Sequence, residues 1–197
     1  MATTATFTAG SGVLSEFGDA ANNSLITRRD STGRILLNNG AVPIVGGTPT
    51  IANTSLIQAF GLDGNDTIAL DETNCALPNA NLFGGAGDDI ALVNGGNGAE
   101  TFTITANGTR VRFDGVSPAP FSLDIGTTES LVLHAGAGND TITASNGLSS
   151  LIGLTLDGGD GNDTITGGDG ADQLIGGTGN DLVAGGRGND TASLGSR

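Results

Sequence analysis

Four aspartates near the C-terminus recur every nine residues, at Asp163, Asp172, Asp181 and Asp190. They occupy the sixth position of four consecutive segments, GGDGNDTIT, GGDGADQLI, GGTGNDLVA and GGRGNDTAS. Glycine-rich turns expose carbonyl oxygens, and Ca²⁺ accepts about six to eight oxygen ligands in irregular geometry. Carbonyls from two stacked turns, together with one carboxylate from each, would meet that demand. The spacing therefore predicts a series of calcium sites.

The same segments predict the elements that hold these aspartates in place. Glycines at the first, second and fourth positions allow sharp turns, and the triad after each aspartate forms a short strand whose central residue points inward. With two nonapeptides per coil, alternate turns stack on the same side. We therefore expect turn 158–163 to stack with 176–181, and turn 167–172 with 185–190, with calcium between the members of each pair.

Looser copies of the pattern lie upstream. GLDGNDTIA, GGAGDDIAL and AGAGNDTIT place Asp66, Asp89 and Asp140 at the sixth position, and GGNGAETFT places Glu100 there. We expect turn 61–66 to stack with 84–89, and turn 135–140 with 158–163. Because these aspartates lie 23 residues apart within each pair, the upstream coils should combine one such turn with a longer return.

The upstream spacing also indicates a duplication. Asp66 and Asp140 lie 74 residues apart, as do Asp89 and Asp163, and Ile51 and Ile57 match Ile125 and Leu131 at that offset. We divide the chain into a first solenoid unit with an N-terminal cap (1–92), a second unit (93–157) and a roll of four nonapeptides (158–197).

The composition supports an all-β fold. Glycine accounts for 35 of the 197 residues, and 37% of the chain is hydrophobic, which together favour tight, frequent turns over disorder. Polar and apolar residues alternate in Thr101–Thr105, and no segment has a capped helical period. The predicted fold is a right-handed parallel β-solenoid or β-roll with glycine-rich turns. Its core is expected to consist of Ile, Leu and Val ladders, and the seven phenylalanines are expected to fill its wider parts or ends: Phe7, Phe17, Phe60, Phe83, Phe102, Phe113 and Phe121.

Charge and cysteine content exclude several partners. The 21 acidic residues against seven basic ones give a formal charge of −14, which disfavours nucleic acid and anionic membranes and favours cations. No apolar run is long enough for a membrane span. Cys75 is the single cysteine, so no internal disulfide can form. The first residues, MATTATFTAG, have neither a basic nor an apolar stretch, so we expect no conventional signal peptide.

The nonapeptide GGxGxDxUx resembles the RTX (repeats-in-toxin) calcium-binding repeat. The resemblance is complete over Gly158 to Ser193 and weaker over 61–69, 84–92, 95–103 and 135–143. It implies a secreted or cell-surface bacterial protein that is exported unfolded by a type I system and folds on meeting several calcium ions. Such proteins carry an export signal after the repeats, whereas only LGSR follows here, so a fragment or a processed product is an open alternative.

The resemblance also implies a set of ligands. The aspartates at the sixth position would provide carboxylates, and Asp160 and Asp169 mainly their carbonyls. A metal-free scaffold of Asx turns is the alternative interpretation, and it is stronger for the upstream copies. The predicted metal-site residues are Asp66, Asp89, Asp140, Gly158, Asp160, Asp163, Gly167, Asp169, Asp172, Gly176, Thr178, Asp181, Gly185 and Asp190.

The sequence does not favour an enzyme. His134 is the only histidine and matches Phe60 at the 74-residue offset, which indicates a position on the solenoid wall. Cys75 lies in the loop-like stretch DETNCALP, and no phosphate-binding loop or nucleophile elbow is present. Paired carboxylates for glycoside hydrolysis are harder to exclude.

Two functions remain open. The first is a structural module of an extracellular assembly, such as a fibre, surface layer or adhesin, in which copies of the chain pack head to tail. The second is a non-catalytic, calcium-dependent folding and export domain of a larger secreted hydrolase or toxin. Binding to carbohydrate or ice through a threonine-bearing face is a third alternative.

Overall fold

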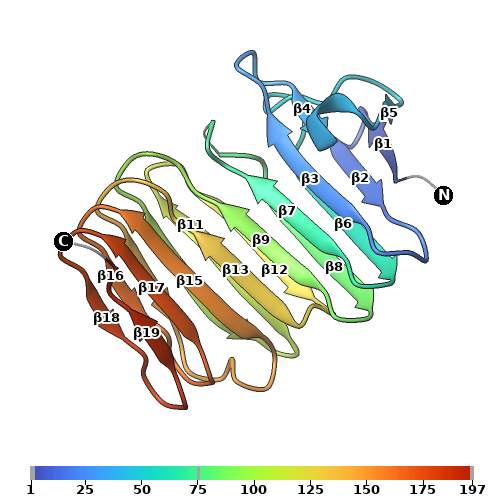
Figure 1. The fold of residues 1–197 in the computed structure, drawn as a ribbon. Coiled ribbons are helices and arrows are strands. Elements are labelled where there is room, and N and C mark those ends of the chain that lie inside the picture. The colour runs from blue at the N-terminus through green and yellow to red at the C-terminus, as the bar shows by residue number, and fades with distance from the viewer. Residues whose placement is uncertain (1–2, 75, 196–197) are drawn as a thin grey trace.

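The computed structural model describes residues 3–74 and 76–195. Within them the chain winds into strands that form two facing sheets, with β1 and β19 at opposite ends of the stack (Figure 1). Each coil contributes one strand to each sheet and reverses direction at glycine-rich turns. The predicted all-β solenoid with parallel strands is confirmed.

Within the described residues the large sheet has eleven strands, and their spatial order differs from their order in the chain. That spatial order is β18 (Leu182–Ala184), β16 (Thr164–Thr166), β14 (Thr141–Ala144), β10 (Thr101–Asn107), β11 (Arg110–Ser117), β12 (Phe121–Gly126), β8 (Ala80–Ala86), β6 (Leu56–Asp63), β2 (Val13–Phe17), β1 (Thr4–Thr8) and β5 (Ile44–Val45).

The small sheet has eight strands in the part of the chain that the structure describes. Their spatial order is β19 (Thr191–Ser193), β17 (Gln173–Thr178), β15 (Gly153–Asp160), β13 (Ser130–His134), β9 (Ile90–Asn94), β7 (Thr67–Asp71), β3 (Ser24–Arg29) and β4 (Ile35–Leu37). Neighbouring strands of this sheet pair in register. For example, Leu131 of β13 pairs with Ala91 of β9 on one side and with Leu154 of β15 on the other.

The solenoid departs from a purely parallel arrangement in three places. β1 pairs antiparallel with β2, and β4 pairs antiparallel with β3. In the middle of the chain β10, β11 and β12 form an antiparallel meander within the large sheet. The meander turns at Gly108 and Thr109. It adds two strands to one sheet only.

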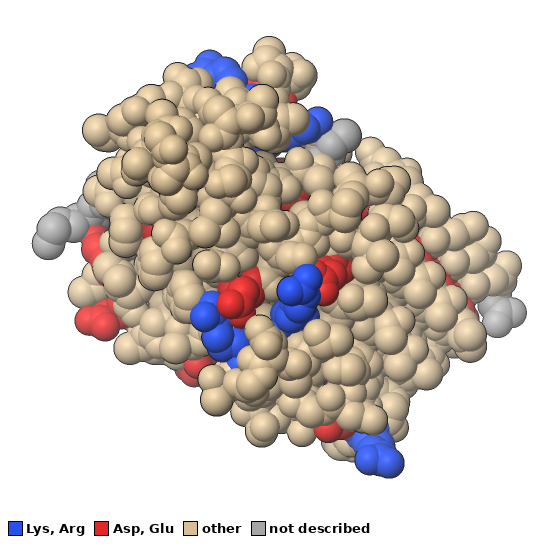
Figure 2. Space-filling model, turned by 180° about the vertical axis from the view of Figure 1, so that it is seen from behind, with Lys and Arg blue, Asp and Glu red and all other residues tan. Residues whose placement is uncertain are grey.

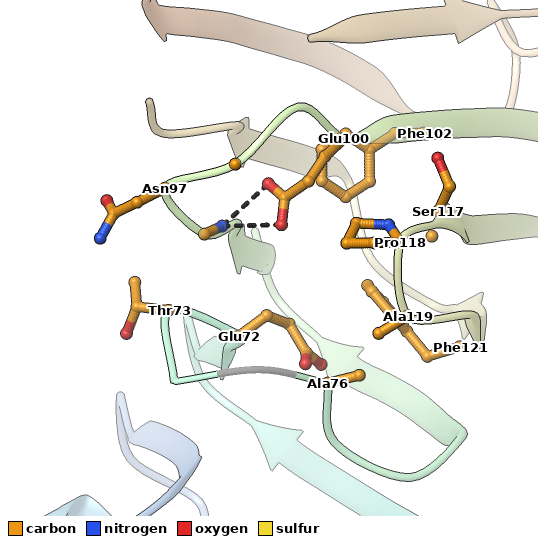
Figure 3. Close-up of a pocket in the computed structure, with 13 residues that line it drawn as sticks. Glu72, Thr73, Ala76, Asn97, Glu100, Phe102, Ser117, Pro118, Ala119 and Phe121 are labelled. Atoms are coloured by element: carbon orange, nitrogen blue, oxygen red, sulfur yellow. Dashed lines mark hydrogen bonds between the residues drawn. The ribbon is translucent and has the colours of Figure 1, made fainter. Parts of the chain in front are cut away.

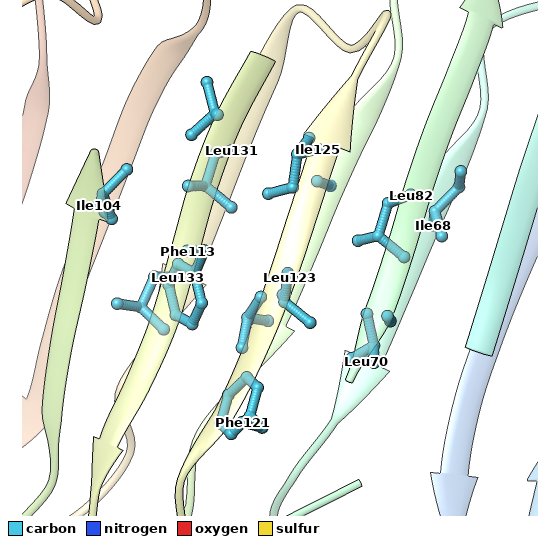
Figure 4. Close-up of a cluster of buried hydrophobic side chains, with 14 of the residues drawn as sticks. Ile68, Leu70, Leu82, Ile104, Phe113, Phe121, Leu123, Ile125, Leu131 and Leu133 are labelled. Carbon is cyan, nitrogen blue, oxygen red and sulfur yellow. The ribbon is translucent and has the colours of Figure 1, made fainter. Parts of the chain in front are cut away.

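The core lies between the sheets, because inward and outward residues alternate along each strand. On β13, Leu131 and Leu133 are fully buried, and they face Ile125 and Leu123 of β12 across the core (Figure 4). In the C-terminal nonapeptides Ile165 and Leu174 point inward as predicted. Val183 is partly buried against the core, and Ala192 is exposed.

Three of the seven phenylalanines are not in the core, contrary to the prediction. Phe17, Phe60 and Phe83 are half-buried residues on the outer side of the large sheet. Their rings stack with centroid separations of 5.2 and 5.3 Å, and the Arg110 guanidinium lies 4.4 Å from the Phe83 centroid. In-register parallel pairing brings identical outward positions together, so the rings form a ladder without being enclosed.

The N-terminal end of the stack is covered by the segment 30–55. It contains β4, β5 and one 3₁₀ turn, η1 (Asn38–Gly40). Ile35 and Leu37 of β4 are fully buried. Among the described residues, no helix is both long enough and apolar enough to cross a membrane.

The copies related by the 74-residue offset lie in exchanged sheets. β7, which follows Asp66, belongs to the small sheet, whereas β14, which follows Asp140, belongs to the large sheet. Ile51 is exposed in a loop while its match Ile125 is buried in β12, so the likeness does not extend to that pair. The proposed boundaries at 92/93 and 157/158 fall inside β9 and β15, and the small sheet pairs across both.

Candidate metal centre

The turns between the sheets stack into two columns along the solenoid. We call edge one the side where the chain passes from the large to the small sheet, at turns 18–23, 61–66, 84–89, 126–129, 167–172 and 185–190. We call edge two the opposite side, at turns 95–100, 135–140, 158–163 and 176–181. All four stacking pairs expected from the sequence are present.

On edge two, carboxylates join each turn to the next. The backbone N–H of Glu100 donates to Asp140 Oδ1 at 2.7 Å, and that of Asp140 donates to Asp163 Oδ1 at 2.8 Å. The N–H of Asp163 donates in turn to Asp181 Oδ1 at 3.0 Å. One oxygen of each aspartate therefore satisfies a backbone donor of the preceding coil.

Edge one repeats this ladder. The N–H groups of Asn23 and Asp66 donate to Oδ1 of Asp66 and Asp89, each at 2.7 Å, and the N–H of Asp89 donates to Glu129 Oε2 at 2.8 Å. Asp172 N–H donates to Asp190 Oδ1 at 3.1 Å. Between Glu129 and Asp172 the longer return 145–152 takes the place of a repeat turn.

A second ladder is formed by the asparagine at the fifth position. Asn139 Oδ1 accepts the N–H of Asn162, and Asn162 Oδ1 accepts the N–H of Asn180, both at 2.8 Å. Upstream, Asn65 Oδ1 accepts from Asp88 N at 3.2 Å. In the pair Asn162–Asp163, the asparagine thus accepts an N–H of the following coil, whereas the aspartate accepts an N–H of the preceding coil.

The second oxygen of these aspartates is buried and has no hydrogen-bond partner among the described residues. This applies to the Oδ2 atoms of Asp66, Asp89, Asp140, Asp163, Asp172 and Asp181. A buried, unpaired carboxylate oxygen is costly, so such atoms in a native protein are evidence of a missing partner such as a proton or a cation. A metal-free scaffold of Asx turns would explain the hydrogen bonds that Oδ1 accepts. It does not explain why Oδ2 is buried without a partner.

The glycine at the first position of each turn leaves room beside this oxygen. A Cβ placed on Gly167 would lie 2.5 Å from Gly185 O and 2.8 Å from Asp172 Oδ2. At Gly158 it would overlap Asp163 Oδ2 and lie 2.7 Å from Gly176 O. A carboxylate oxygen and a carbonyl oxygen of the adjacent coil therefore converge where a side chain would otherwise be. Such oxygen-lined space suits a hard cation.

The glycines at the second and fourth positions let adjacent coils approach closely. Gly159 and Gly161 have φ values of +96° and +137°, and a Cβ on them would overlap the carbonyl oxygens of Gly136 and Gly138. This close approach keeps the carbonyls of stacked turns within a few ångströms of one another.

Burial raises the pKa of several of these carboxyls. The pKa values of Asp89, Asp140 and Asp163 are raised chiefly because burial disfavours the charged form. The pKa of Asp172 is raised to about 6 by burial and by the charge of Asp190. A bound cation would reverse this tendency, because it favours the ionised carboxylate.

The acidic residues are concentrated at the two edges and not on the outer face of the large sheet. Most of the face seen in Figure 2 carries neither sign of charge, and basic and acidic side chains lie together near its centre. On β11 and β12, Arg110 pairs with Asp124 at 3.0 Å and Arg112 with Asp114 at 2.7 Å. The negative charge is therefore least balanced along the turns, where cations would bind.

The donor set fits calcium only if the backbone contributes. Among residues 3–74 and 76–195, no three His, Cys, Asp or Glu side chains come together in a way that would hold a metal ion. The carbonyls of the stacked turns would therefore have to supply most of the ligands. Calcium tolerates such a set, whereas zinc prefers nitrogen and sulfur ligands.

The residues predicted at the third position lie at the rim of the columns. Thr178 Oγ1 donates to Asp160 Oδ1 at 2.8 Å, which ties two stacked turns together. The Asp169 carboxylate accepts the N–H groups of Gly147 and Leu148 at 2.8 and 2.9 Å, and so caps the return 145–152. These side chains serve the scaffold, and their metal-binding role remains a prediction.

Sequence reasoning missed three members of the columns. Glu100 was noted in the aspartate place but not assigned to a site, and Glu129 and Asn23 were not noted. Gly18 lies five residues before Asn23, and a Cβ on it would overlap Asn23 Oδ1 and Gly61 O, as in the true repeats. A search for glycine followed five residues later by any side-chain oxygen would have found Asn23 and Glu100.

His134, one of the two residues weighed as catalytic, lies apart from the columns. His134 is exposed on the outer side of β13, with Nδ1 3.2 Å from Asp157 Oδ2, as expected of a wall position. Cys75, the other residue considered, lies outside the described residues.

Comparison with known proteins supports the calcium interpretation. Residues 132–148 and 157–192 match the model of the RTX calcium-binding nonapeptide repeat, in four copies. No curated protein matches the chain. The match covers most of edge two and the C-terminal turns of edge one, where the unpaired Oδ2 atoms of Asp140, Asp163, Asp172 and Asp181 lie. The matched segments of this chain are therefore similar to RTX calcium-binding nonapeptide repeats.

Proposed function

We propose that this chain is a calcium-folded solenoid module of a secreted or cell-surface bacterial protein, with ions held between stacked turns on both edges. The observation that carries the proposal is the unequal use of the two carboxylate oxygens. Oδ1 of Asp163 and Asp181 completes the backbone ladder, while Oδ2 is buried without a partner. The sites are proposed to extend upstream of the matched repeats, to Asp66 and Asp89 on edge one.

The test is a calcium titration of chelated protein, followed by circular dichroism and by thermal melting. We expect β-signal and melting temperature to rise with Ca²⁺ and to respond little to equal Mg²⁺, because Mg²⁺ demands near-octahedral geometry and dehydrates reluctantly. A fold that is complete and equally stable in chelator would contradict the proposal and leave the turns as a metal-free scaffold.

The proposed dependence of folding on calcium also supports an extracellular location for this chain. Repeats of this family are typical of secreted bacterial proteins exported by type I systems. A module that is partly unfolded at low calcium and fully folded at high calcium suits export before folding. We propose that route for this chain, and secretion of a tagged chain from a type I-competent host would test it.

A role in assembly is supported by the open end of the solenoid. The outer edges of β18 and β19 have no partner strand among the described residues, and Leu182 and Leu194 there are 66% and 52% exposed. Unpaired strand edges with exposed apolar residues favour pairing with another chain. The N-terminal end is covered by segment 30–55, so head-to-tail stacking would require that segment to move.

Two outcomes separate assembly from the alternative, a calcium-dependent folding and export domain of a larger hydrolase or toxin. Light scattering that rises with calcium would favour assembly, and substitution of Leu182 by Lys should then suppress it. A monomer at all calcium concentrations would favour the appended domain.

A further inference from the structure

Glu16 of β2 is a carboxyl enclosed in the core between the two sheets. Its side chain is fully buried, Oε2 accepts the hydroxyl of Thr27 on β3 at 2.7 Å, and Oε1 has no hydrogen-bond partner among the described residues. Because β2 pairs with β1 on one side and with β6 on the other, Glu16 lies between Ala5 and Ala59. These two small side chains leave room for a carboxyl in a layer that is otherwise apolar.

The charged residues of the surrounding strands do not reach this carboxyl. β1 and β4 contain none, and those of β6 and β7, Asp63 and Asp71, lie at the strand ends. On β3, Arg28 Nε lies 3.8 Å from Asp71 Oδ2, and Arg29 donates from Nε to a backbone carbonyl of the β7–β8 connection. Burial therefore acts on Glu16 without a compensating charge, and it raises the pKa to about 7.

Glu72 provides a contrast, because its carboxyl borders a cavity. That cavity, of about 190 Å³, lies between the turn 95–100, the corner 115–121 and the connection that begins at Glu72 (Figure 3). A space of this size has room for water, so Glu72 can be hydrated without a movement of the fold. Glu16 has no exposed surface. Its ionised form can therefore be hydrated only if an adjacent element moves.

The adjacent element that is held least is the N-terminal cap, by which we mean β1 together with segment 30–55. It covers Glu16 and its partner Thr27 from the N-terminal end of the stack, through Ala5 of β1 and Leu37 of β4 (Figure 1). β4 has three residues and β5 two, and a cavity of about 160 Å³ remains within segment 30–55. On the other side, β6 and β7 pair with further coils. Short strands around a cavity favour local opening of the cap.

We propose that Glu16 is a pH-sensitive latch of the N-terminal cap. The cap stays closed while the carboxyl is protonated, and ionisation favours an open form in which β1 and β4 leave β2 and β3. Opening hydrates the carboxylate and exposes the edges of β2 and β3, which is the movement that head-to-tail stacking requires. That last consequence rests on the proposed role in assembly, whereas the latch itself does not.

Hydrogen exchange of the full chain in saturating calcium measures the opening. Amides of β1 and β4 report on the cap, and those of β13 report on the middle of the solenoid. The closed state binds the proton more tightly than the open state, so closure is fully favoured below about pH 4.5 and loses this contribution up to about pH 7. From about pH 5.5 to about pH 8.5 we expect protection factors of the cap to fall about tenfold or more, and those of β13 to stay constant.

Three variants assign the effect to the carboxyl. Glu16→Gln removes the titrating group, so protection of the cap should no longer depend on pH. Thr27→Val removes a hydrogen bond that lowers the pKa of Glu16, so the midpoint of the profile should move to higher pH. Asp114→Asn changes a carboxylate that pairs with Arg112 on the meander, remote from the cap, and should leave the profile unchanged.

Four results would overturn the latch: a flat profile in the wild type, an equal loss of protection in β13, a loss retained in folded Glu16→Gln, or an unshifted midpoint in Thr27→Val. Light scattering in the same samples separates the latch from assembly. Scattering that rises with pH in the wild type and not in Glu16→Gln would support regulated stacking. Opening of the cap without scattering would support the latch and contradict the assembly role.

Discussion

The backbone N–H of Asp140 donates to Asp163 Oδ1 at 2.8 Å, while Asp163 Oδ2 is buried without a hydrogen-bond partner. The two oxygens of one carboxylate therefore have different roles. In the folded chain Oδ1 joins adjacent coils, and we propose that Oδ2 binds a cation. This division makes the structural and the calcium-binding roles separable by mutation.

Asp163→Asn should separate them directly. The amide oxygen can still accept the N–H of Asp140, but the charge is lost, so the calcium needed for half-maximal folding should rise several-fold. In chelator the variant should be as stable as the wild type or more stable, because the charges of Asp181, Asp157 and Asp160 oppose ionisation of Asp163. Calcium titrations followed by circular dichroism measure both effects.

Asn162→Ala is the matched control at the neighbouring position. It removes the acceptor of the Asn180 N–H and should cost about 1 kcal/mol with or without calcium. If Asp163→Asn instead lowered stability equally in chelator and in calcium, the aspartate would be a scaffold residue only.

Gly161→Ala should prevent close stacking of the coils. The new Cβ would overlap the carbonyl oxygen of Gly138, and φ is +137°, so we expect a loss of about 3 kcal/mol or more in calcium. Gly153→Ala, at the start of β15, has its nearest non-neighbouring atom 3.7 Å away and should change stability by no more than about 0.5 kcal/mol. Denaturant unfolding of both variants tests this, and equal effects would show that the stacking distance is not limiting.

Glu16 should make the protein less stable as pH rises. It is fully buried, accepts a hydrogen bond from Thr27 Oγ1 at 2.7 Å, and burial raises its pKa from 4.5 to about 7. The folded state then binds the proton more tightly than the unfolded state. The protonated Glu16 therefore contributes to the free energy of unfolding. This contribution is fully present below about pH 4.5 and is lost progressively up to about pH 7, to a total of about 3 kcal/mol.

Unfolding of Glu16→Gln across that range, at fixed calcium, gives the comparison. The difference in unfolding free energy between variant and wild type should grow with pH and level off above about pH 7. A constant difference would mean that Glu16 is not protonated in the folded protein.

Calcium and protons should compete at Asp172. Its pKa of about 6 means that a fraction of the carboxyl is protonated near that pH, and a cation would displace the proton. Calcium addition to weakly buffered protein should therefore release more protons at pH 6 than at pH 8, and apparent affinity should fall as pH drops below about 6. Asp172→Asn should reduce the release; an unchanged release would assign the protons to other groups.

The fold of the C-terminal third could be predicted from local residue patterns because the motif is self-contained. Each turn of the motif supplies its own glycines, its ladder oxygen and its inward residue, so Ile165 and Leu174 and the stacking of Asp163 on Asp181 followed from spacing alone. The upstream aspartates also stacked as expected, even though Leu62 occupies a glycine place and adopts a φ of +85°.

Tertiary structure alone decided what lies around these turns. The antiparallel insertion of β11 and β12 adds strands to the large sheet only, and the odd number of passes between the sheets from Asp66 to Asp140 places these sequence duplicates on opposite edges. Because side chains alternate between the two faces of a strand, Phe17, Phe60 and Phe83 could be assigned to one common face of the sheet. The sequence did not show whether that face points into the core or outward. The sequence determined the turn chemistry because that chemistry is local, whereas sheet order and facing depend on pairing between residues far apart in the chain.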